Sequence, residues 1–229
     1  MKVKRKPPAQ NVRRVSAING NSRHTIVNKC QRSIQCESFQ EYKLVLLLER
    51  NPLVLDYVSQ PETLSFYTDE GREMTYTPDF KVWMSKGEII LHEVTLTERR
   101  NRKTQQQREA AAERICTERS WQYVVHTETT LPIGAELANL QLLFRFRAGG
   151  FANPDIVQIV SRLLPAGEHI SLCDLITRVS TTTRLDKKQF LPAILHQLWH
   201  GQLQIDWQKL LFHETDPNPT ADIWWEVSS

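Results

Sequence analysis

The feature that most constrains this chain is a pair of acidic residues placed at two consecutive apolar segments. Asp79 directly precedes the segment 80–84, and Glu93 lies inside the next one, 88–95. An isolated charge in such a segment is costly unless it stands at a strand end or binds a ligand. The turn-forming residues 85–87 (Ser-Lys-Gly) separate the two segments, which predicts neighbouring strands. We therefore expect the two carboxylates to converge across a hairpin.

Two convergent carboxylates supply the hard oxygen ligands that Mg²⁺ or Mn²⁺ prefers. A cation held there would polarise a phosphodiester oxygen and lower the pKa of an attacking water. The pattern is typical of metal-dependent nucleases with a PD-(D/E)xK motif. Here Thr95 stands where that motif has its lysine. On spacing alone, a pair of ordinary surface carboxylates remains the alternative.

The composition is that of an ordinary globular protein, with 40% hydrophobic and 24% charged residues in a chain of 229. No apolar run approaches the ~20 residues that a membrane helix needs. The N-terminus lacks the apolar region of a secretory signal, and the four cysteines have no zinc-type spacing. We expect a cytoplasmic protein with free thiols. No Walker loop or GxGxxG motif indicates a small-molecule substrate or cofactor.

Basic residues are unevenly placed in a chain whose net charge is only +3. One cluster occupies residues 1–14 and a second occupies residues 98–119. Local basic clusters on a nearly neutral chain favour a surface that binds a polyanion such as DNA. A solvated tail and a solvated helix face are the alternative interpretation.

The pattern of apolar residues and turns predicts three parts. Residues 1–30 are basic and polar and are expected to form a flexible tail. Residues 31–148 are expected to form a mixed α/β (α+β) domain. Its predicted helices cover 37–50, 102–117 and 137–144, and its predicted strands cover 53–57, 63–67, 74–76, 80–84, 88–95 and 121–126.

After a boundary at Ala148-Gly149-Gly150 the pattern changes to short helices. Three are predicted in residues 151–229, followed by a two-stranded hairpin of 203–207 and 223–227. Three helices and a hairpin are typical of a winged-helix domain, a fold that binds DNA in some proteins and protein in others. Trp224 and Trp225 are either half-buried in the wing or, if one is exposed, part of a protein-docking surface.

From Glu37 to about Phe146 the chain resembles the TnsA-family endonuclease subunits of heteromeric cut-and-paste transposases. The matching features run in order: ESFQEYKLVLLLERNPLVLDYVSQP, YTPDF, GEIILHEV, a basic helix, WQYVV and ANLQLLFRFR. The resemblance implies a restriction-endonuclease-like catalytic domain followed by a winged-helix-like module. It also implies an active site of Glu41, Asp79 and Glu93, with the backbone carbonyl of Val94 as an extra ligand of Mg²⁺ or Mn²⁺. Glu41 fits this pattern better than Glu37.

The same resemblance implies a role in bacterial DNA transposition. Such subunits nick the 5′ strands at the ends of the transposon, while a separate DDE transposase (TnsB-like) cuts and joins the 3′ ends. Double-stranded DNA at the transposon ends, that transposase and an AAA+ regulator (TnsC-like) are the expected partners.

Thr95 departs from the family pattern, since the family's lysine would stabilise charge on the phosphate. A cation from elsewhere could replace it, and Lys43, Arg99 and Lys103 are the nearest in sequence or helix geometry. The metal and Glu93 could also suffice at a reduced rate, or the site could be inactive. Two rival functions follow: a non-catalytic DNA-binding and assembly subunit of the same complex, and a stand-alone restriction or repair nuclease.

Overall fold

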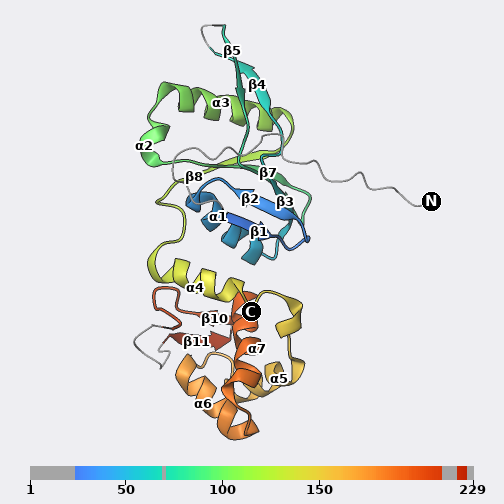
Figure 1. Cartoon of the computed structure of the whole chain (residues 1–229), viewed down its shortest axis with the longest axis vertical. Coiled ribbons are helices and arrows are strands. Elements are labelled where there is room, and N and C mark those ends of the chain that lie inside the picture. The colour runs from blue at the N-terminus through green and yellow to red at the C-terminus, as the bar shows by residue number, and fades with distance from the viewer. Residues whose placement is uncertain (1–23, 69–70, 213–220, 226–229) are drawn as a thin grey trace, which may run out of the picture. The chain divides into compact units, whose positions relative to one another are not determined.

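The computed structural model describes residues 24–68, 71–212 and 221–225 (Figure 1). The chain divides into two compact units between Leu131 and Pro132. Among the described helices, none is both long and apolar enough to cross a membrane.

The first unit is built on a four-stranded sheet in the order β3-β6-β7-β8. Strands β3, β6 and β7 pair antiparallel, and β8 joins β7 in parallel after a helical crossover. The elements, in chain order, are β1 (His24–Val27), β2 (Ser33–Cys36), α1 (Phe39–Arg50), β3 (Val54–Ser59), β4 (Leu64–Tyr67), β5 (Glu73–Tyr76), β6 (Phe80–Met84), β7 (Ile89–Val94), α2 (Thr97–Arg100), α3 (Lys103–Glu118) and β8 (Gln122–His126).

Two apolar clusters hold this unit together on opposite faces of the sheet. On one face, Tyr57 and Phe80 pack with the apolar side of α1 and with the β1-β2 hairpin. On the other, Leu91 packs with Ala112 of α3 and with the β4-β5 hairpin. Figure 1 shows α1 and α3 on the two sides of the sheet. The helices and strands expected between residues 37 and 126 are confirmed, with bounds that differ by a few residues.

The turn between β6 and β7 fixes the register of the two strands. The Gly87 N–H donates to the Met84 carbonyl, and Gly87 has a φ of 88°, a conformation that glycine adopts without a steric penalty. The resulting register sets Phe80 opposite His92. Asp79, just before Phe80, is thereby placed beside the end of β7.

The tail expected over residues 1–30 ends earlier than predicted. Strand β1 pairs with β2, so residues 24–30 are part of the folded unit, while residues 1–23 lie outside the described residues. The connecting turn contains no glycine or proline. The buried Asn28 stabilises this turn, because its side-chain oxygen accepts hydrogen bonds from the N–H groups of Cys30 and Arg32.

The described residues of the second unit form four α-helices and a three-stranded antiparallel sheet in the order β10-β11-β9. The expected pairing of residues 203–207 with 223–227 is confirmed for the described strands, and Trp224 and Trp225 are both half-buried. The elements are α4 (Gly134–Phe144), a 3₁₀ turn (Gly149–Phe151), α5 (Pro154–Leu163), β9 (Ile170–Ser171), α6 (Leu172–Thr183), α7 (Lys187–Trp199), β10 (Leu203–Ile205) and β11 (Asp222–Trp225).

Helix α4 belongs to this second unit, so the division of the chain falls before the boundary that the sequence predicts at residues 148–150. Asn139 is nearly fully buried and fastens α4 to the segment after β10. Its side-chain NH₂ donates to the Lys209 carbonyl at 2.8 Å, and its oxygen accepts from the Leu211 N–H at 2.8 Å. Phe144 also packs edge-on against Trp199 of α7.

We predict that Asn139→Ala lowers the free energy of unfolding of the second unit by about 2–4 kcal/mol, because two backbone groups lose their partners. Urea unfolding of the full chain measures this, with the exposed Ala138→Ser as the control. Unchanged stability of the Asn139 variant would contradict the assignment of α4 to this unit.

Candidate functional site

A polar pocket of about 480 Å³ lies in the first unit, at the end of β7 where α1 and α3 begin. Side chains of opposite charge line it. Four are acidic (Glu37, Glu41, Asp79 and Glu93), and three are basic (Arg99, Arg102 and Arg108). The three acidic residues singled out from the sequence therefore line one pocket, together with Val94 and Thr95.

Asp79 is fixed by the end of the neighbouring strand. Its Oδ2 accepts the Val94 N–H at 2.7 Å. Burial raises the pKa of Asp79 well above its usual range, and the charges of Glu93 and Glu41 raise it further, while the Val94 N–H acts in the opposite direction. The half-buried Asp79 carboxyl is thus held in place but is short of positive charge.

Glu93 is held by a network of neutral donors. The Tyr76 hydroxyl donates to its Oε2 at 2.5 Å, and the Tyr123 hydroxyl lies 3.1 Å from that of Tyr76. Burial raises the pKa of Glu93 to about 7, although hydrogen bonds from Tyr76 and Gln105 lower it. This carboxyl therefore gains and loses its proton near neutral pH.

Glu41 has a structural role as well as a place in the pocket. It lies in the first turn of α1, where its two oxygens accept from the Glu37 N–H and the Ser38 hydroxyl, each at 2.8 Å. Ser38 in turn accepts the Glu41 N–H, so the two side chains cap the helix. Burial raises the pKa of Glu41, and these hydrogen bonds lower it.

Thr95 is buried beside Glu93 and brings no charge to the pocket. Its N–H donates to the His126 carbonyl at 2.9 Å, which ties the end of β7 to β8. Of the three cations suggested as replacements for the missing lysine, Arg99 lines the pocket. Lys43 is buried with its ammonium 5.5 Å from the Phe39 ring, and Lys103 lines a different groove.

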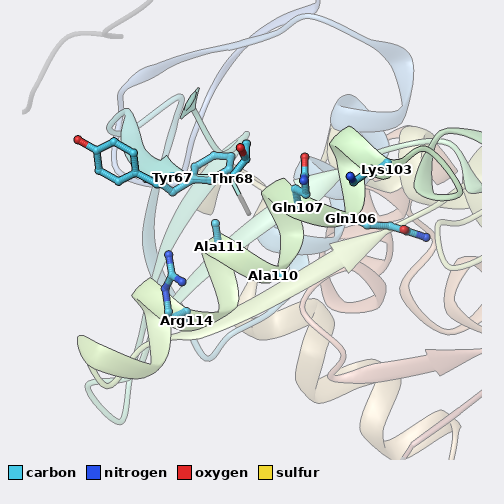
Figure 2. Close-up of a pocket in the computed structure, with 9 residues that line it drawn as sticks. Tyr67, Thr68, Lys103, Gln106, Gln107, Ala110, Ala111 and Arg114 are labelled. Carbon is cyan, nitrogen blue, oxygen red and sulfur yellow. The ribbon is translucent and has the colours of Figure 1, made fainter. Parts of the chain in front are cut away.

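That second groove lies between the β4-β5 hairpin and the other side of α3 (Figure 2). Figure 2 shows Tyr67 and Thr68 facing a stripe of α3 side chains that includes Lys103, Gln107 and Arg114. The basic cluster predicted at residues 98–119 is therefore divided: part of it lines the acidic pocket, and part lies along this groove.

His92 neighbours Glu93 in sequence but belongs to the opposite face of the strand. It stacks on His126, with its Nδ1 2.8 Å from Nε2 of that residue. Burial, and then the charge of His126, lower the pKa of His92 to about 3, so His92 is neutral at physiological pH. Burial also lowers the pKa of His126. His92 therefore belongs to the packing between β7 and β8 and does not line the acidic pocket.

The donor set at the pocket fits a divalent cation in its chemistry. Asp79 and Glu93 offer carboxylate oxygens, and burial raises the pKa of both. Among the described residues, no group of three or more His, Cys, Asp or Glu side chains is close enough to enclose a metal ion. A cation here would be held by two carboxylates together with backbone or water oxygens, while Glu41 stays engaged in its helix cap.

The sequence did not point to Tyr76 or Tyr123, and it placed Gln105 and Arg108 only within the basic segment of residues 98–119, not in the acidic pocket. Tyr76 precedes the Pro-Asp pair and Tyr123 lies in an apolar strand, so both are expected in the core. Their proximity to Glu93 follows from β4-β5 folding against α3 and from the parallel pairing of β7 with β8. Gln105 lies one turn before Glu109 on α3, and that spacing is the signal that could have placed it on the inner face.

The raised pKa of Glu93 predicts a specific pH dependence of stability in the absence of divalent cations. The ordinary pKa of this group is 4.5 and its folded pKa is about 7, so the folded state holds the proton more tightly. Stability should fall as pH rises from about 4.5 to about 7. We predict that Glu93→Gln removes this component and is more stable than wild type by about 1–3 kcal/mol at pH 8.

Denaturant unfolding in EDTA at pH 5, 6, 7 and 8 tests this prediction. The exposed Glu88→Gln, on the turn before the same strand, is the matched control and should keep the wild-type pH profile. Parallel profiles for wild type and Glu93→Gln would show that Glu93 does not carry the expected shift.

Comparison with known proteins identifies the segment that supplies most of the residues lining this pocket. Residues 51–128 match the family model described as TnsA-like endonuclease N terminal. The match covers β3 to β8, including Asp79, Glu93 and α3, and the mixed α/β unit fits a restriction-endonuclease-like fold. A search of curated proteins found no match. The resemblance drawn from the sequence is confirmed: the chain carries a TnsA-like N-terminal endonuclease domain.

Proposed function

We propose that this chain is the endonuclease subunit of a cut-and-paste transposase and that it nicks the 5′ strands at transposon ends. The observation that carries the proposal is the convergence of Asp79 and Glu93 in one polar pocket of a TnsA-like domain. The three arginines that line the same pocket support a phosphate-bearing substrate, because guanidinium groups bind phosphate oxygens well.

The proposed cofactor is Mg²⁺ or Mn²⁺, held by Asp79, Glu93 and the backbone carbonyl of Val94. When bound, such a cation withdraws charge from a phosphate oxygen and lowers the pKa of an attacking water. Tyr76 and Gln105 keep Glu93 in place, and the Val94 N–H keeps Asp79 in place. Glu41 completes the acidic wall from the start of α1.

The proposed reaction is hydrolysis of one DNA phosphodiester. A bond forms between phosphorus and the water oxygen, and the bond from phosphorus to a deoxyribose oxygen breaks. The deoxyribose oxygen leaves with a proton, and the water loses one. Arg99 and Arg102 are exposed at the rim of the pocket and are suited to contact the neighbouring phosphates of the DNA backbone.

The proposed partners are a DDE transposase (TnsB-like) that processes the 3′ ends and an AAA+ regulator (TnsC-like). We propose that the second unit is a winged-helix-like module, with α5, α6 and α7 as its helices and β10-β11 as its wing. Most side chains in the middle and last turns of α7 are buried, including Ile194, Leu198 and Trp199. Few remain to enter a DNA groove, which favours protein docking for this module.

The absence of a lysine at residue 95 favours one rival, a non-catalytic subunit that binds DNA and assembles the complex. A stand-alone nuclease is the second rival. It would cleave DNA with its own sequence or lesion preference and would need no transposase.

Strand-specific end mapping distinguishes these functions. A transposon-end duplex is incubated with this protein, its partner transposase and Mg²⁺ or Mn²⁺. We expect cuts at the 5′ ends, and we expect Asp79→Asn to reduce them by about 10²-fold or more while its amide oxygen still accepts the Val94 N–H. The exposed Glu88→Gln should cut like wild type.

The other outcomes assign the function differently. Normal 3′ cutting with no 5′ cutting, even after Thr95→Lys, would support the non-catalytic subunit. Cutting at other sequences without the transposase would support the stand-alone nuclease. Wild-type cutting by Asp79→Asn would place the chemistry outside this pocket.

A further inference from the structure

Helix α3 turns two charged side chains, Arg108 and Glu109, toward the protein. Residues 105, 108, 109 and 112 follow the spacing of one helix face. Ala112 on this face is fully buried and Glu109 nearly so, which makes it the inner face. Arg108 therefore lies on the side of α3 that packs on the protein, and its side chain is half-buried where it lines the pocket.

The neighbours of Arg108 on this face have partners within the protein. Glu109 accepts three hydrogen bonds from the Arg100 guanidinium and one from the Gln105 amide. The Arg108 Nε, in contrast, is buried and has no hydrogen-bond partner among the described residues. A buried donor without a partner is costly, and this one belongs to a side chain that lines a pocket able to receive a ligand.

The pocket places Arg108 together with the carboxyls of Asp79 and Glu93 and with Thr95. Thr95 occupies the position at which a lysine would be expected, and it is buried and uncharged. Arg99 and Arg102 line the same pocket but are exposed, and Arg102 lies 3.9 Å from Glu98 on the surface. Of these three arginines, Arg108 combines burial with a donor that lacks a partner.

We propose that Arg108 is a catalytic residue that supplies, from α3, the positive charge that Thr95 does not supply from β7. Its guanidinium would donate to a non-bridging oxygen of the scissile phosphodiester and stabilise the charge that develops there. Arginine suits this role because it stays protonated and presents several donors in a fixed plane. Charge stabilisation of this kind is worth most in a site that excludes water. The inference rests on the proposed endonuclease function.

Single-turnover cleavage at saturating DNA tests the proposal directly, with the full chain, its partner transposase and Mn²⁺. Arg108→Ala should slow 5′ cleavage by about 10²–10³-fold, and Arg108→Lys should slow it by roughly tenfold. Affinity for the transposon-end duplex should change far less than the rate. The exposed Arg72→Ala, in the same unit and outside the pocket, should stay within about twofold of wild type.

A charge-relocation variant separates catalysis from structure. Thr95→Lys in the Arg108→Ala background should recover at least about tenfold of the lost rate, because it returns a cation to the same pocket.

Titration of Mn²⁺ in the absence of DNA gives a readout besides activity. Arg108→Ala should bind Mn²⁺ about fivefold more tightly than wild type, since a repelling charge beside the carboxylates is gone. Thermal melting verifies that each variant is folded.

The possible results distinguish a failure of the role of Arg108 from a failure of the proposed endonuclease function. Wild-type cleavage by a folded Arg108→Ala, or unchanged Mn²⁺ affinity, would overturn the role of Arg108 and leave the endonuclease standing. If the protein with Arg108 intact cleaves only after Thr95→Lys is introduced, the role of Arg108 is overturned and the endonuclease function stands. Absence of 5′ cleavage in both wild type and Thr95→Lys would overturn the proposed function and the inference with it.

Discussion

The pairing of β6 with β7 is the constraint on which the candidate site depends. The turn at Gly87 sets Phe80 opposite His92, and this register brings Asp79 to the Val94 N–H and next to Glu93. A shift by one residue would turn Glu93 to the opposite face and His92 toward the pocket. The stacked pair of His92 and His126, and the bond from the Thr95 N–H to the His126 carbonyl, oppose such a shift from the β8 side.

The second constraint is electrostatic. Three carboxyls in one partly buried pocket repel each other, and the protein offsets this only in part. Neutral donors hold Glu93 and Asp79, a helix cap holds Glu41, and arginines come from the segment 99–108. The raised pKa values of the three acids follow from burial and from this incomplete compensation. We propose that a site in this condition binds a cation and a phosphate together better than either one alone.

The sequence predicted the parts of the fold and site that depend on local pattern. The apolar segments and turns between residues 37 and 126 gave the elements of the first unit, and the placement of Asp79 and Glu93 before and within adjacent strands gave their convergence. The sequence did not predict the features that depend on tertiary packing. The β1-β2 turn is made by the side chain of Asn28 without a glycine or proline, and α4 joins the second unit through Asn139 and distant backbone groups. Arg108 has no sequence signal of its own, because its environment arises only when α3 packs over the sheet.

The central claim is that Asp79 and Glu93 form a cation-binding centre in a TnsA-like domain. Crystals of the full chain soaked in Mn²⁺, with data collected at a wavelength at which manganese scatters anomalously, test it most directly. The account predicts an anomalous peak within coordination distance of the Asp79 and Glu93 carboxylates, and its loss in Asp79→Asn. A saturating Mn²⁺ soak with no peak in this pocket, or an unchanged peak in Asp79→Asn, would contradict the account.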